Sequence, residues 1–217
     1  MILVPVKNLA HAKQRLASAL EQRDRTELAQ AMLFDVLTTL AAWADRPEVS
    51  LVTSDPFALQ LARHFSFSVI PDNANRSETD AIEMATRVCD SRGVDTTLVI
   101  PGDIPLIQAW ELERIFQDAP AEGSVLVPSF DGRGTNAVLR RPSALFPLRF
   151  GNESFEPHLA AARATQKPCA VLNLPGIALD VDQPSDLFEL ISAPGETRSQ
   201  RLLRHWNLTD LPRAANE

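Results

Sequence analysis

Residues 98–107 read LVIPGDIPLI, a short apolar run that leads into Gly102 and Asp103. The first part has the length and branched side chains of a buried strand, and Pro105 indicates that a helix starts near the end. A carboxylate at the end of such a strand is ill placed for the core. It either caps the following helix or faces a ligand.

Apolar runs of this kind recur along the chain and alternate with segments of helical periodicity. The strand-like runs are residues 2–6, 49–53, 68–70, 97–100, 124–128, 135–139 and 170–174. The clearest helical stripe lies between residues 28 and 43, and further helices are expected at residues 56–64, 80–89, 110–117, 155–165 and 184–191. This alternation predicts a doubly wound α/β sheet, mostly parallel and covered by helices on both faces, with ligands beyond the carboxyl ends of the strands.

The 217 residues suit one domain with a short appendage. We expect residues 1–191 to form a single domain. Within it, residues 124–174 break the alternation, because two strands meet through the turn-rich DGRGTN, and we expect a small antiparallel insertion that forms one wall of a cleft. Residues 192–217 begin with the helix-breaking APGE and form a C-terminal appendage, either a packed tail or a contact in a homodimer.

Charge and apolar content exclude several classes of protein. The net charge of −7 argues against nucleic-acid and membrane-surface binding, which usually require a basic excess. The N-terminal MILVPVK lacks the features of a signal peptide, and no window approaches the roughly 18 apolar residues of a membrane span. We therefore expect a cytoplasmic protein. Cys89 and Cys169 have no CxxC spacing, which favours two buried reduced thiols over a disulfide or a metal site.

Three cations follow the first strand. The segment KNLAHAKQRLA contains Lys7, Lys13 and Arg15 but no glycine. A phosphate bound here would therefore be held by side-chain charges and not by the backbone of a glycine-rich loop. The segment indicates a phosphate site, with a solvated basic loop as the alternative.

Acidic side chains follow two later strands. Besides Asp103, the segment IALDVDQPSDL places Asp180 and Asp182 two residues apart, so that both point to one side of an extended chain. Neighbouring carboxylates repel each other unless a cation offsets them, and Mg²⁺ takes a few carboxylates together with ligand phosphates. The three aspartates predict a Mg²⁺ site. The alternatives are helix capping by Asp103 and an Asx turn at Asp182.

Two further loops precede predicted helices. In NRSETDAIEMA, Ser77, Thr79 and Asp80 either cap the helix or hydrogen-bond a nucleobase. In RFGNESF, Gly151 and Ser154 precede a helix whose first N–H groups suit an anion, with a simple N-cap serine as the alternative.

Together these features favour nucleotidyl transfer. The nucleophile can be a phosphate of the second substrate, already ionised at neutral pH, so that no general base is required. The protein then aligns the two phosphates and stabilises the departing pyrophosphate with Lys or Arg. The four histidines share no metal-ligand spacing, and no Gly-x-Ser-x-Gly elbow or Cys/His pair points to covalent catalysis.

Five ordered motifs across about residues 1 to 190 resemble the guanylyltransferases of coenzyme F420 biosynthesis. They are VPVKNLAHAKQRLA, PGDIPL, DGRGTNAVLRRP, LRFGNESFEPHLAAAR and IALDVDQPSDL. That family is similar in fold to the MobA-like nucleotidyltransferases, so the resemblance implies a Rossmann-like sheet. It also implies transfer of GMP from GTP to a three-carbon phospho-acid, with Mg²⁺ as cofactor and release of pyrophosphate. The acid would be 2-phospho-L-lactate, phosphoenolpyruvate or 3-phospho-D-glycerate.

The resemblance implies a role for each residue singled out above. The metal carboxylates would be Asp103, Asp180 and Asp182. The catalytic residues would be Asp103, Lys13 and Arg15. The pocket for the carboxylate of the acid would be formed by Thr135, Gly151 and Ser154. The nucleotide site would contain Lys7, Lys13, Arg15, Ser77, Thr79 and Asp80.

One departure from the family pattern keeps the choice of base and acid open. The segment RSETD stands where we expect a Gly-Leu-Asn turn in many relatives, and it is closer to the Ser-x-Thr-Asp of other nucleotidyltransferases. The alternatives are a nucleotidyltransferase with another base or acceptor, such as a molybdopterin or sugar phosphate, and a non-catalytic GTP-binding module. The missing glycine-rich loop argues against the first of these.

Overall fold

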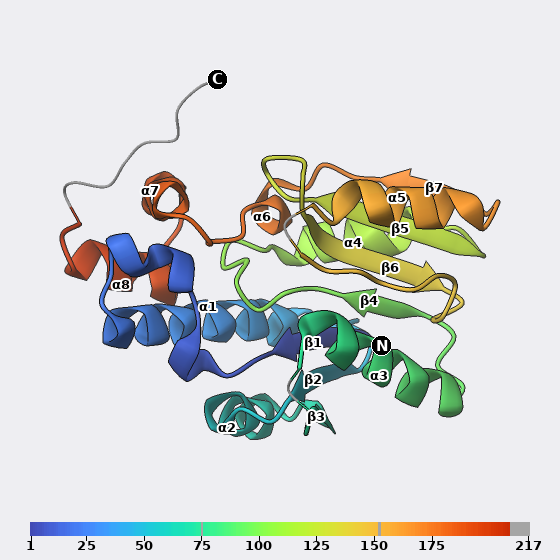
Figure 1. Ribbon diagram of the computed structural model, residues 1–217, viewed down its shortest axis with the longest axis horizontal. Coiled ribbons are helices and arrows are strands. Elements are labelled where there is room, and N and C mark those ends of the chain that lie inside the picture. The colour runs from blue at the N-terminus through green and yellow to red at the C-terminus, as the bar shows by residue number, and fades with distance from the viewer. Residues whose placement is uncertain (75, 152, 209–217) are drawn as a thin grey trace.

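The structure is a computed structural model that describes residues 1–74, 76–151 and 153–208. Within these residues the strands form a seven-stranded sheet in the order β3-β2-β1-β4-β6-β5-β7 (Figure 1). Strands β3, β2, β1 and β4 are parallel, β6 runs antiparallel to β4 and β5, and β7 is parallel to β5. The strands are β1 (Ile2–Val6), β2 (Val49–Thr53), β3 (Ser68–Pro71), β4 (Thr97–Val99), β5 (Gly123–Pro128), β6 (Thr135–Arg141) and β7 (Cys169–Val171). The predicted mostly parallel sheet with an antiparallel insertion is confirmed.

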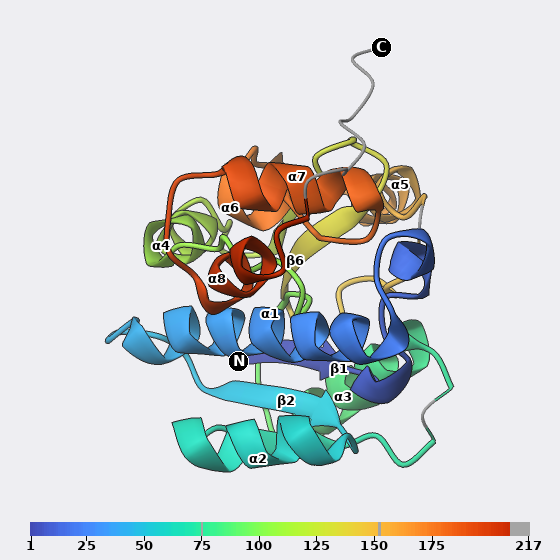
Figure 2. The ribbon, with the colours of Figure 1, turned by 90° about the vertical axis from the view of Figure 1, so that its left-hand side faces the viewer.

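Helices cover both faces of the sheet, and a further layer lies outside α1. One face carries α1 (Gln22–Ala42), α2 (Pro56–Phe65), α4 (Ala109–Gln117) and α6 (Pro175–Ala178). The other face carries α3 (Glu78–Ser91) and α5 (Phe155–Ala164). The outer layer on α1 consists of α7 (Pro184–Ser192) and α8 (Arg198–His205), as Figure 2 shows. Two short 3-10 helices, η1 (Leu9–His11) and η2 (Gln14–Ser18), follow β1.

Burial on both sides explains the composition of β1 and α1. Alternate residues of β1 point to opposite faces, so Ile2 packs on the α1 side and Leu3 on the α3 side. A strand covered on both faces must be apolar throughout. In the same way α1 presents Leu33 to the sheet, and Leu28 and Met32 to α7 and α8. The outer layer therefore completes the core of α1.

The strand order reverses between β1 and β4. The chain moves from β1 outward through β2 to β3, and then returns with β4 on the other side of β1. In open α/β sheets such a reversal leaves a crevice at the carboxyl ends of the two strands, where ligands bind. After β4 the chain passes so close to α1 that a Cβ atom at Gly102 would lie only 3.0 Å from Cδ1 of Leu33. The next residue, Asp103, therefore lies at the crevice.

The helix expected at residues 110–117 is present as α4, but Pro105 does not start it. Helix α4 begins at Ala109, where Gln108 and Glu111 form a capping box. The Glu111 carboxylate accepts from the backbone N–H of Gln108 at 2.9 Å and from that of Gly176, on α6, at 2.7 Å. Because Gln108 is the N-cap, the alternative role of Asp103 as the cap of this helix is also excluded.

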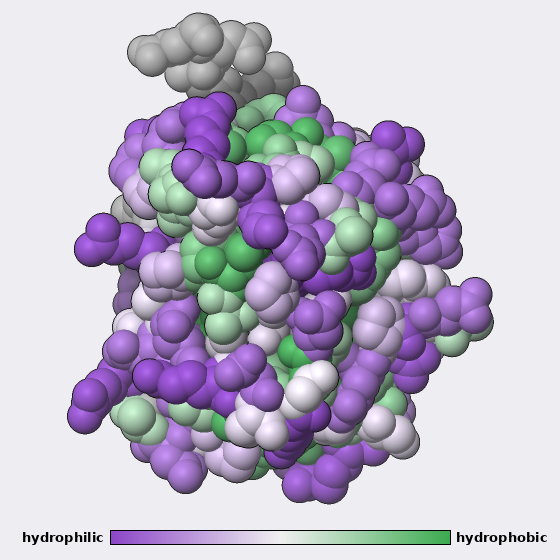
Figure 3. All heavy atoms as spheres, turned by 90° about the vertical axis from the view of Figure 1, so that its right-hand side faces the viewer, coloured by the Kyte–Doolittle hydropathy of each residue, from purple (hydrophilic) through white to green (hydrophobic). Residues whose placement is uncertain are grey.

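The helices and the two cysteines were expected to show no membrane span and no disulfide. None of the helices in the described part of the chain is both long and apolar enough to cross a membrane. The face at the right of Figure 1 intersperses hydrophobic with hydrophilic residues (Figure 3). Cys89 is buried and Cys169 is half-buried, and both are free thiols. A disulfide between them is therefore excluded.

The described part of the appendage packs on α1. The carboxylate of Asp35, in α1, accepts hydrogen bonds from the backbone N–H groups of Arg198 at 2.7 Å and Ser199 at 2.8 Å, in the first turn of α8. Leu203 is fully buried between α1 and α7. Residues 209–217 lie outside the described residues, and a homodimer contact through the appendage stays a prediction.

Replacement of Asp35 tests how strongly α8 is attached. We expect D35A to lower the free energy of unfolding by about 1–2 kcal/mol, because two N–H groups at the start of α8 lose their buried acceptor. Urea unfolding measures this difference. The control E27A removes an exposed carboxylate from the same helix and should change the free energy by less than about 0.5 kcal/mol. Equal stability of D35A and the wild type would contradict the proposed attachment.

Candidate active site

Two cavities lie at the crevice between β1 and β4, and they share a wall. The first, of about 270 Å³, is lined by the end of β1 and the segment up to Lys13, and we call it the β1 cavity. The second, of about 310 Å³, is lined mainly by the β5–β6 turn, the start of β6, three residues ahead of α5 (Phe150, Gly151 and Ser154) and five residues ahead of and in α7 (Leu179, Asp180, Asp182, Gln183 and Asp186), and we call it the insertion cavity. Glu78, Pro101 and Asp103 line both cavities. A ligand in one cavity therefore lies next to a ligand in the other.

Lys13 connects Asp103, which follows β4, with Asp182, which precedes α7. Its ammonium group forms an ion pair with Asp103 and a second one, of 2.8 Å, with Oδ1 of Asp182. Arg15 pairs with the other oxygen of Asp182 at 3.2 Å. The backbone of Lys13 is left-handed, with φ of 56° and ψ of 43°. This conformation costs a non-glycine residue about 1 kcal/mol, so the ion pairs hold Lys13 in a strained position.

The charges of this cluster stabilise one another. Burial alone would lower the pKa of Lys13, whose side chain is only 7% exposed, but Asp103 and Asp182 raise it above the usual lysine value. In turn, burial alone would raise the pKa of Asp182, and the neighbouring Lys13 lowers it below the usual aspartate value. Lys13 and Asp182 are therefore both charged at neutral pH.

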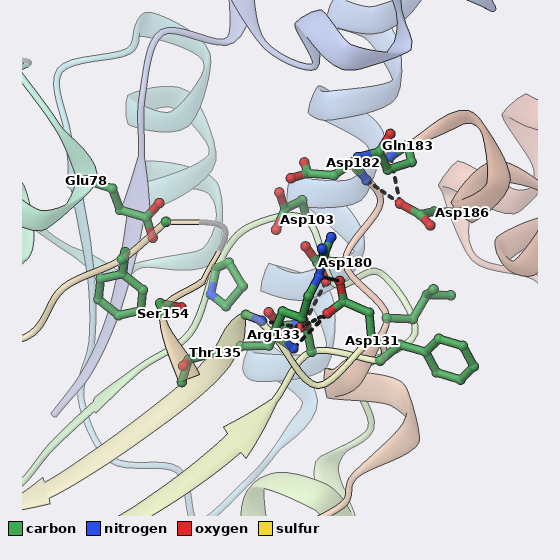
Figure 4. A pocket seen from close by; sticks show the side chains of 18 residues that line it. Glu78, Asp103, Asp131, Arg133, Thr135, Ser154, Asp180, Asp182, Gln183 and Asp186 are labelled. Carbon is green, nitrogen blue, oxygen red and sulfur yellow. Dashed lines mark hydrogen bonds and ion pairs between the residues drawn. The ribbon is translucent and has the colours of Figure 1, made fainter. Parts of the chain in front are cut away.

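Asp180 has no such cation beside it. Its Oδ1 accepts from the Asn136 amide at 2.9 Å, and the same amide donates to the carbonyl groups of Ile177 and Ala178. Burial, and then the nearby charge of Asp103, raise the pKa of Asp180 to about 6. Figure 4 shows Asp103, Asp180 and Asp182 gathered in the insertion cavity. The three aspartates therefore line one cavity, and among the described residues Asp180 forms no ion pair.

The chemistry of this donor set fits a hard cation such as Mg²⁺. Oδ1 of Asp103 is buried and has no hydrogen-bond partner, which is costly unless something else binds it. Among residues 1–74, 76–151 and 153–208, no three acidic, histidine or cysteine side chains are already close enough to form a preformed metal site. The Lys13 ammonium lies between two of the carboxylates, so a metal ion would compete with it.

Asp186 performs the capping role that the sequence left open for Asp182. The Asp186 carboxylate accepts from the backbone N–H groups of Asp182 at 2.9 Å and Gln183 at 2.6 Å, ahead of α7. The side chain of Asp182 is consequently not needed for an Asx turn. It is directed to Lys13 and Arg15.

Thr135, Gly151 and Ser154, the three residues predicted to bind a carboxylate, all line the insertion cavity. Thr135 begins β6, and Ser154 precedes α5 without capping it through its side chain. Gly151 has a φ of +147°, a backbone conformation that residues with a Cβ atom rarely adopt. Together with Phe150, the described part of the loop before α5 therefore contributes an aromatic residue, a glycine and a hydroxyl group to the lining of this cavity.

The predicted nucleotide-binding residues divide into two groups. Lys7 and Lys13 line the β1 cavity, and Lys7 also pairs with Asp72 at 2.5 Å. Ser77 is the N-cap of α3, where its hydroxyl oxygen accepts from the backbone N–H of Asp80 at 3.0 Å. Thr79 accepts from the backbone N–H of Phe150 at 3.0 Å and so braces the loop of the insertion cavity. Ser77, Thr79 and Asp80 are not among the described residues that line the two cavities.

The sequence analysis did not predict four charged residues that line the cavities, which are Glu78, Asp131, Arg133 and Asp186. Glu78 lines both cavities, and burial, together with the charge of Asp103, raises its pKa to about 7. Arg133 lines the insertion cavity and pairs with Asp131 at 2.9 Å (Figure 4). Burial alone would raise the pKa of Asp131, but hydrogen bonds from Ser129 and Arg133 hold it at about 2. Glu78 and Arg133 lie in segments whose sequence is also typical of a helix cap and of a turn, so the pattern alone did not indicate a site.

The chain is similar to guanylyltransferases over nearly its whole length. A family model described as "Guanylyl transferase CofC like" matches residues 1–216. A phosphoenolpyruvate guanylyltransferase of Roseiflexus castenholzii is 35% identical over 94% of this chain and 93% of its own. A 2-phospho-L-lactate guanylyltransferase of Methanothermobacter thermautotrophicus is 32% identical over 97% and 92%. A 3-phospho-D-glycerate guanylyltransferase of Colwellia psychrerythraea is 31% identical over 89% and 92%.

The fold is shared with a solved structure of much lower identity. A Desulfovibrio desulfuricans protein, whose name assigns it provisionally to the nucleotide-diphospho-sugar transferases, has a TM-score of 0.75. It covers 94% of this chain and 93% of its own, at 18% identity. This likeness supports the fold alone.

The raised pKa of Asp180 predicts a pH-dependent cost to stability without metal. Below about pH 3 the side chain is largely protonated in both the folded and the unfolded chain. As the pH rises from about 4 to 6, only the unfolded chain ionises freely, so the folded state loses stability. At pH 7.5 in a chelator we expect D180N to be more stable than the wild type by about 2 kcal/mol, and near pH 3 the two should converge.

Urea unfolding at both pH values measures this effect. The control D45N removes an exposed carboxylate and should show no pH-dependent gain. A D180N variant no more stable than the wild type at pH 7.5 would show that Asp180 is not under electrostatic strain.

Proposed function

The chain belongs to the family of CofC-like guanylyl transferases, and we propose that it transfers GMP from GTP to a three-carbon phospho-acid in coenzyme F420 biosynthesis. The relatives described above are named for phosphoenolpyruvate, 2-phospho-L-lactate and 3-phospho-D-glycerate, and we propose the acceptor among these three. The single observation that carries the proposal for this chain is that Asp103 lies in the shared wall of the two cavities. Two substrates bound on either side of one carboxylate are placed for transfer between them.

We assign GTP to the β1 cavity and the acid to the insertion cavity. Lys7 and Lys13 line the first, and their charges suit a triphosphate in a protein without a glycine-rich loop. Arg15 lies beside Asp182 and would add a third cation. In the insertion cavity Arg133, Thr135 and Ser154 offer a cation and two hydroxyl groups, which suit the carboxylate and phosphate of the acid.

We propose that Mg²⁺ is held by Asp103, Asp180 and Asp182. The unpaired Oδ1 of Asp103 and the raised pKa of Asp180 support this proposal, because both indicate oxygen atoms that lack a positive partner. When bound, Mg²⁺ would neutralise charge on the phosphates and help to orient them. The ammonium of Lys13 would then be available to the phosphates of GTP.

The reaction needs little chemistry from the protein. An oxygen of the acceptor phosphate forms a bond to the α-phosphorus of GTP, the bond from that phosphorus to the bridging oxygen of the β-phosphate breaks, and pyrophosphate leaves with the electron pair. The acceptor phosphate is ionised at neutral pH, so no base is required. The chain must align the two phosphates and offset the charge that builds on pyrophosphate, roles that we assign to Lys13 and Arg15.

The cell context that we propose follows from these substrates. GTP and a metabolic phospho-acid are cytoplasmic compounds, which agrees with the expected cytoplasmic location and with small-molecule partners. We also propose that two chains pair through the appendage. Trp206, an apolar residue of the appendage that is only half-buried, would form part of that contact.

Pyrophosphate release tests the reaction directly. With GTP and Mg²⁺ we expect release in the presence of at least one of the three acids and none without an acid, and a chelator should abolish it. ATP and CTP in place of GTP, and a sugar phosphate in place of the acid, distinguish the other nucleotidyltransferases. GTP binding without pyrophosphate release from any pairing would replace the enzyme with a GTP-binding module.

The variant D103N tests the shared wall. We expect its turnover to fall at least about a hundredfold, because a charge that acts at the reacting phosphates is lost. The matched control D118N removes a carboxylate that pairs with Arg114 on the surface of α4 and should keep turnover. Full activity of D103N would refute the proposed arrangement.

The variant K13M tests competition between Lys13 and the metal. Removal of the ammonium leaves Asp103 without its cation and Asp182 with Arg15 alone, so we expect Mg²⁺ to bind at least about tenfold more tightly without nucleotide. Turnover should nevertheless fall, because the phosphates of GTP lose a cation. Calorimetric titration measures the affinity, with K167M, at an exposed pair with Glu122, as the control. Unchanged Mg²⁺ affinity would mean that the metal binds elsewhere.

A further inference from the structure

His158, on α5, connects two parts of the wall of the insertion cavity. The backbone N–H of Arg149 donates to its Nε2 at 2.8 Å, and its Nδ1 lies 3.0 Å from Oγ1 of Thr135. The residue is fully buried, and its ring packs edge-on against Phe150 with 5.2 Å between the ring centroids. Thr135 begins β6 and Phe150 belongs to the loop before α5, so one imidazole joins the strand and the loop.

The contact with Arg149 fixes which ring nitrogen carries the hydrogen. A backbone N–H can only donate, so Nε2 must offer its lone pair and has no hydrogen. Burial, and then the charge of Arg140, lower the pKa of His158 to about 4, so the ring is neutral at neutral pH. A neutral imidazole with a bare Nε2 carries its hydrogen on Nδ1.

The hydrogen on Nδ1 in turn orients the hydroxyl group of Thr135. Nδ1–H donates to Oγ1, so the hydroxyl accepts from the ring and must direct its own hydrogen elsewhere. In the part of the chain that the structure describes, this hydroxyl makes no other side-chain or backbone hydrogen bond. Thr135 lines the insertion cavity, and Figure 4 shows its side chain there beside Ser154.

We propose that His158 is a positioning residue for the acceptor, which makes the Thr135 hydroxyl a donor to an anionic oxygen of the phospho-acid while it anchors the loop that contains Gly151. This inference rests on the proposed function, because the phospho-acid is the acceptor of that reaction. His158 itself does not touch the substrate. It acts through the direction of one hydroxyl group and through the position of one loop.

The tautomer can be measured without turnover. In a chain with the substitutions H11Q, H64Q and H205Q, His158 is the remaining histidine of the four in the sequence. Nitrogen-15 NMR of labelled histidine should show a protonated Nδ1 and a bare Nε2 at pH 7. A protonated Nε2, or a doubly protonated ring, would overturn the proposal.

Steady-state kinetics of H158Q test whether His158 contributes to binding of the phospho-acid. In H158Q the amide oxygen can still accept from the backbone N–H of Arg149, but the NH2 group is on a flexible side chain and no longer donates to Thr135 from the fixed position of Nδ1. We expect the KM for the acid to rise about tenfold, with the KM for GTP changed less than about twofold, because the loss is confined to one hydrogen bond at the acceptor. An equal rise in both KM values would indicate a general structural defect and would overturn the proposal.

A double-mutant cycle with T135V shows whether His158 acts through the hydroxyl group. T135V alone should raise the KM for the acid by a similar factor. In the T135V background, H158Q should then add less than about twofold, because the group it orients is already missing. Effects that multiply in full would contradict action through Thr135.

The NMR and kinetic experiments distinguish a failure of this inference from a failure of the proposed function. A wild-type chain that is inactive with every acid would refute the proposed function, and with it the role of Thr135 as a donor to the acid. An active chain with a protonated Nε2 on His158, or with an unaltered KM for the acid in H158Q, would refute only the role of His158.

Discussion

One ammonium group between two carboxylates holds the site together. Lys13 is 90 residues from Asp103 and 169 residues from Asp182 in the chain, and it pairs with both. A lysine buried without these partners would lose its charge, and the carboxylates without the lysine would repel each other. The segment after β1, the end of β4 and the approach to α7 are therefore fixed relative to one another by charge as well as by apolar packing.

The fold makes this pairing available because of its strand order. β1 and β4 are neighbours, and the reversal between them brings the residues after both strands to one crevice. The antiparallel insertion then adds a second wall, held to α3 through Thr79 and to α5 through His158. Arg140 extends this support, because its buried guanidinium donates to Phe146 in the loop and to Thr86 on α3. The loop of the insertion cavity is thus tied to the rigid part of the fold at several points.

Much of this architecture could be predicted because its signals are local or periodic. Strands such as β1 are continuous apolar runs, and the ends of parallel strands are where ligands bind, so Lys13 and Asp103 could be identified from position alone. Pairings across the chain could not be read in this way. Glu78 was hidden in a segment that looked like a helix cap, and His158 was considered only as a metal ligand, a role that the spacing of the histidines does not support. Pro105 does not start α4, because the capping box of Gln108 and Glu111, which begins three residues later, sets the start of the helix.

The wall shared by the two cavities also has a consequence for the end of the proposed reaction. The guanylylated acid joins the GMP part of GTP and the acid in one molecule. When one half is bound in its cavity, the other half is held at high effective concentration next to the second cavity. We therefore expect the product to dissociate more slowly than GMP or the acid alone, and a following reaction that consumes it would favour sustained turnover.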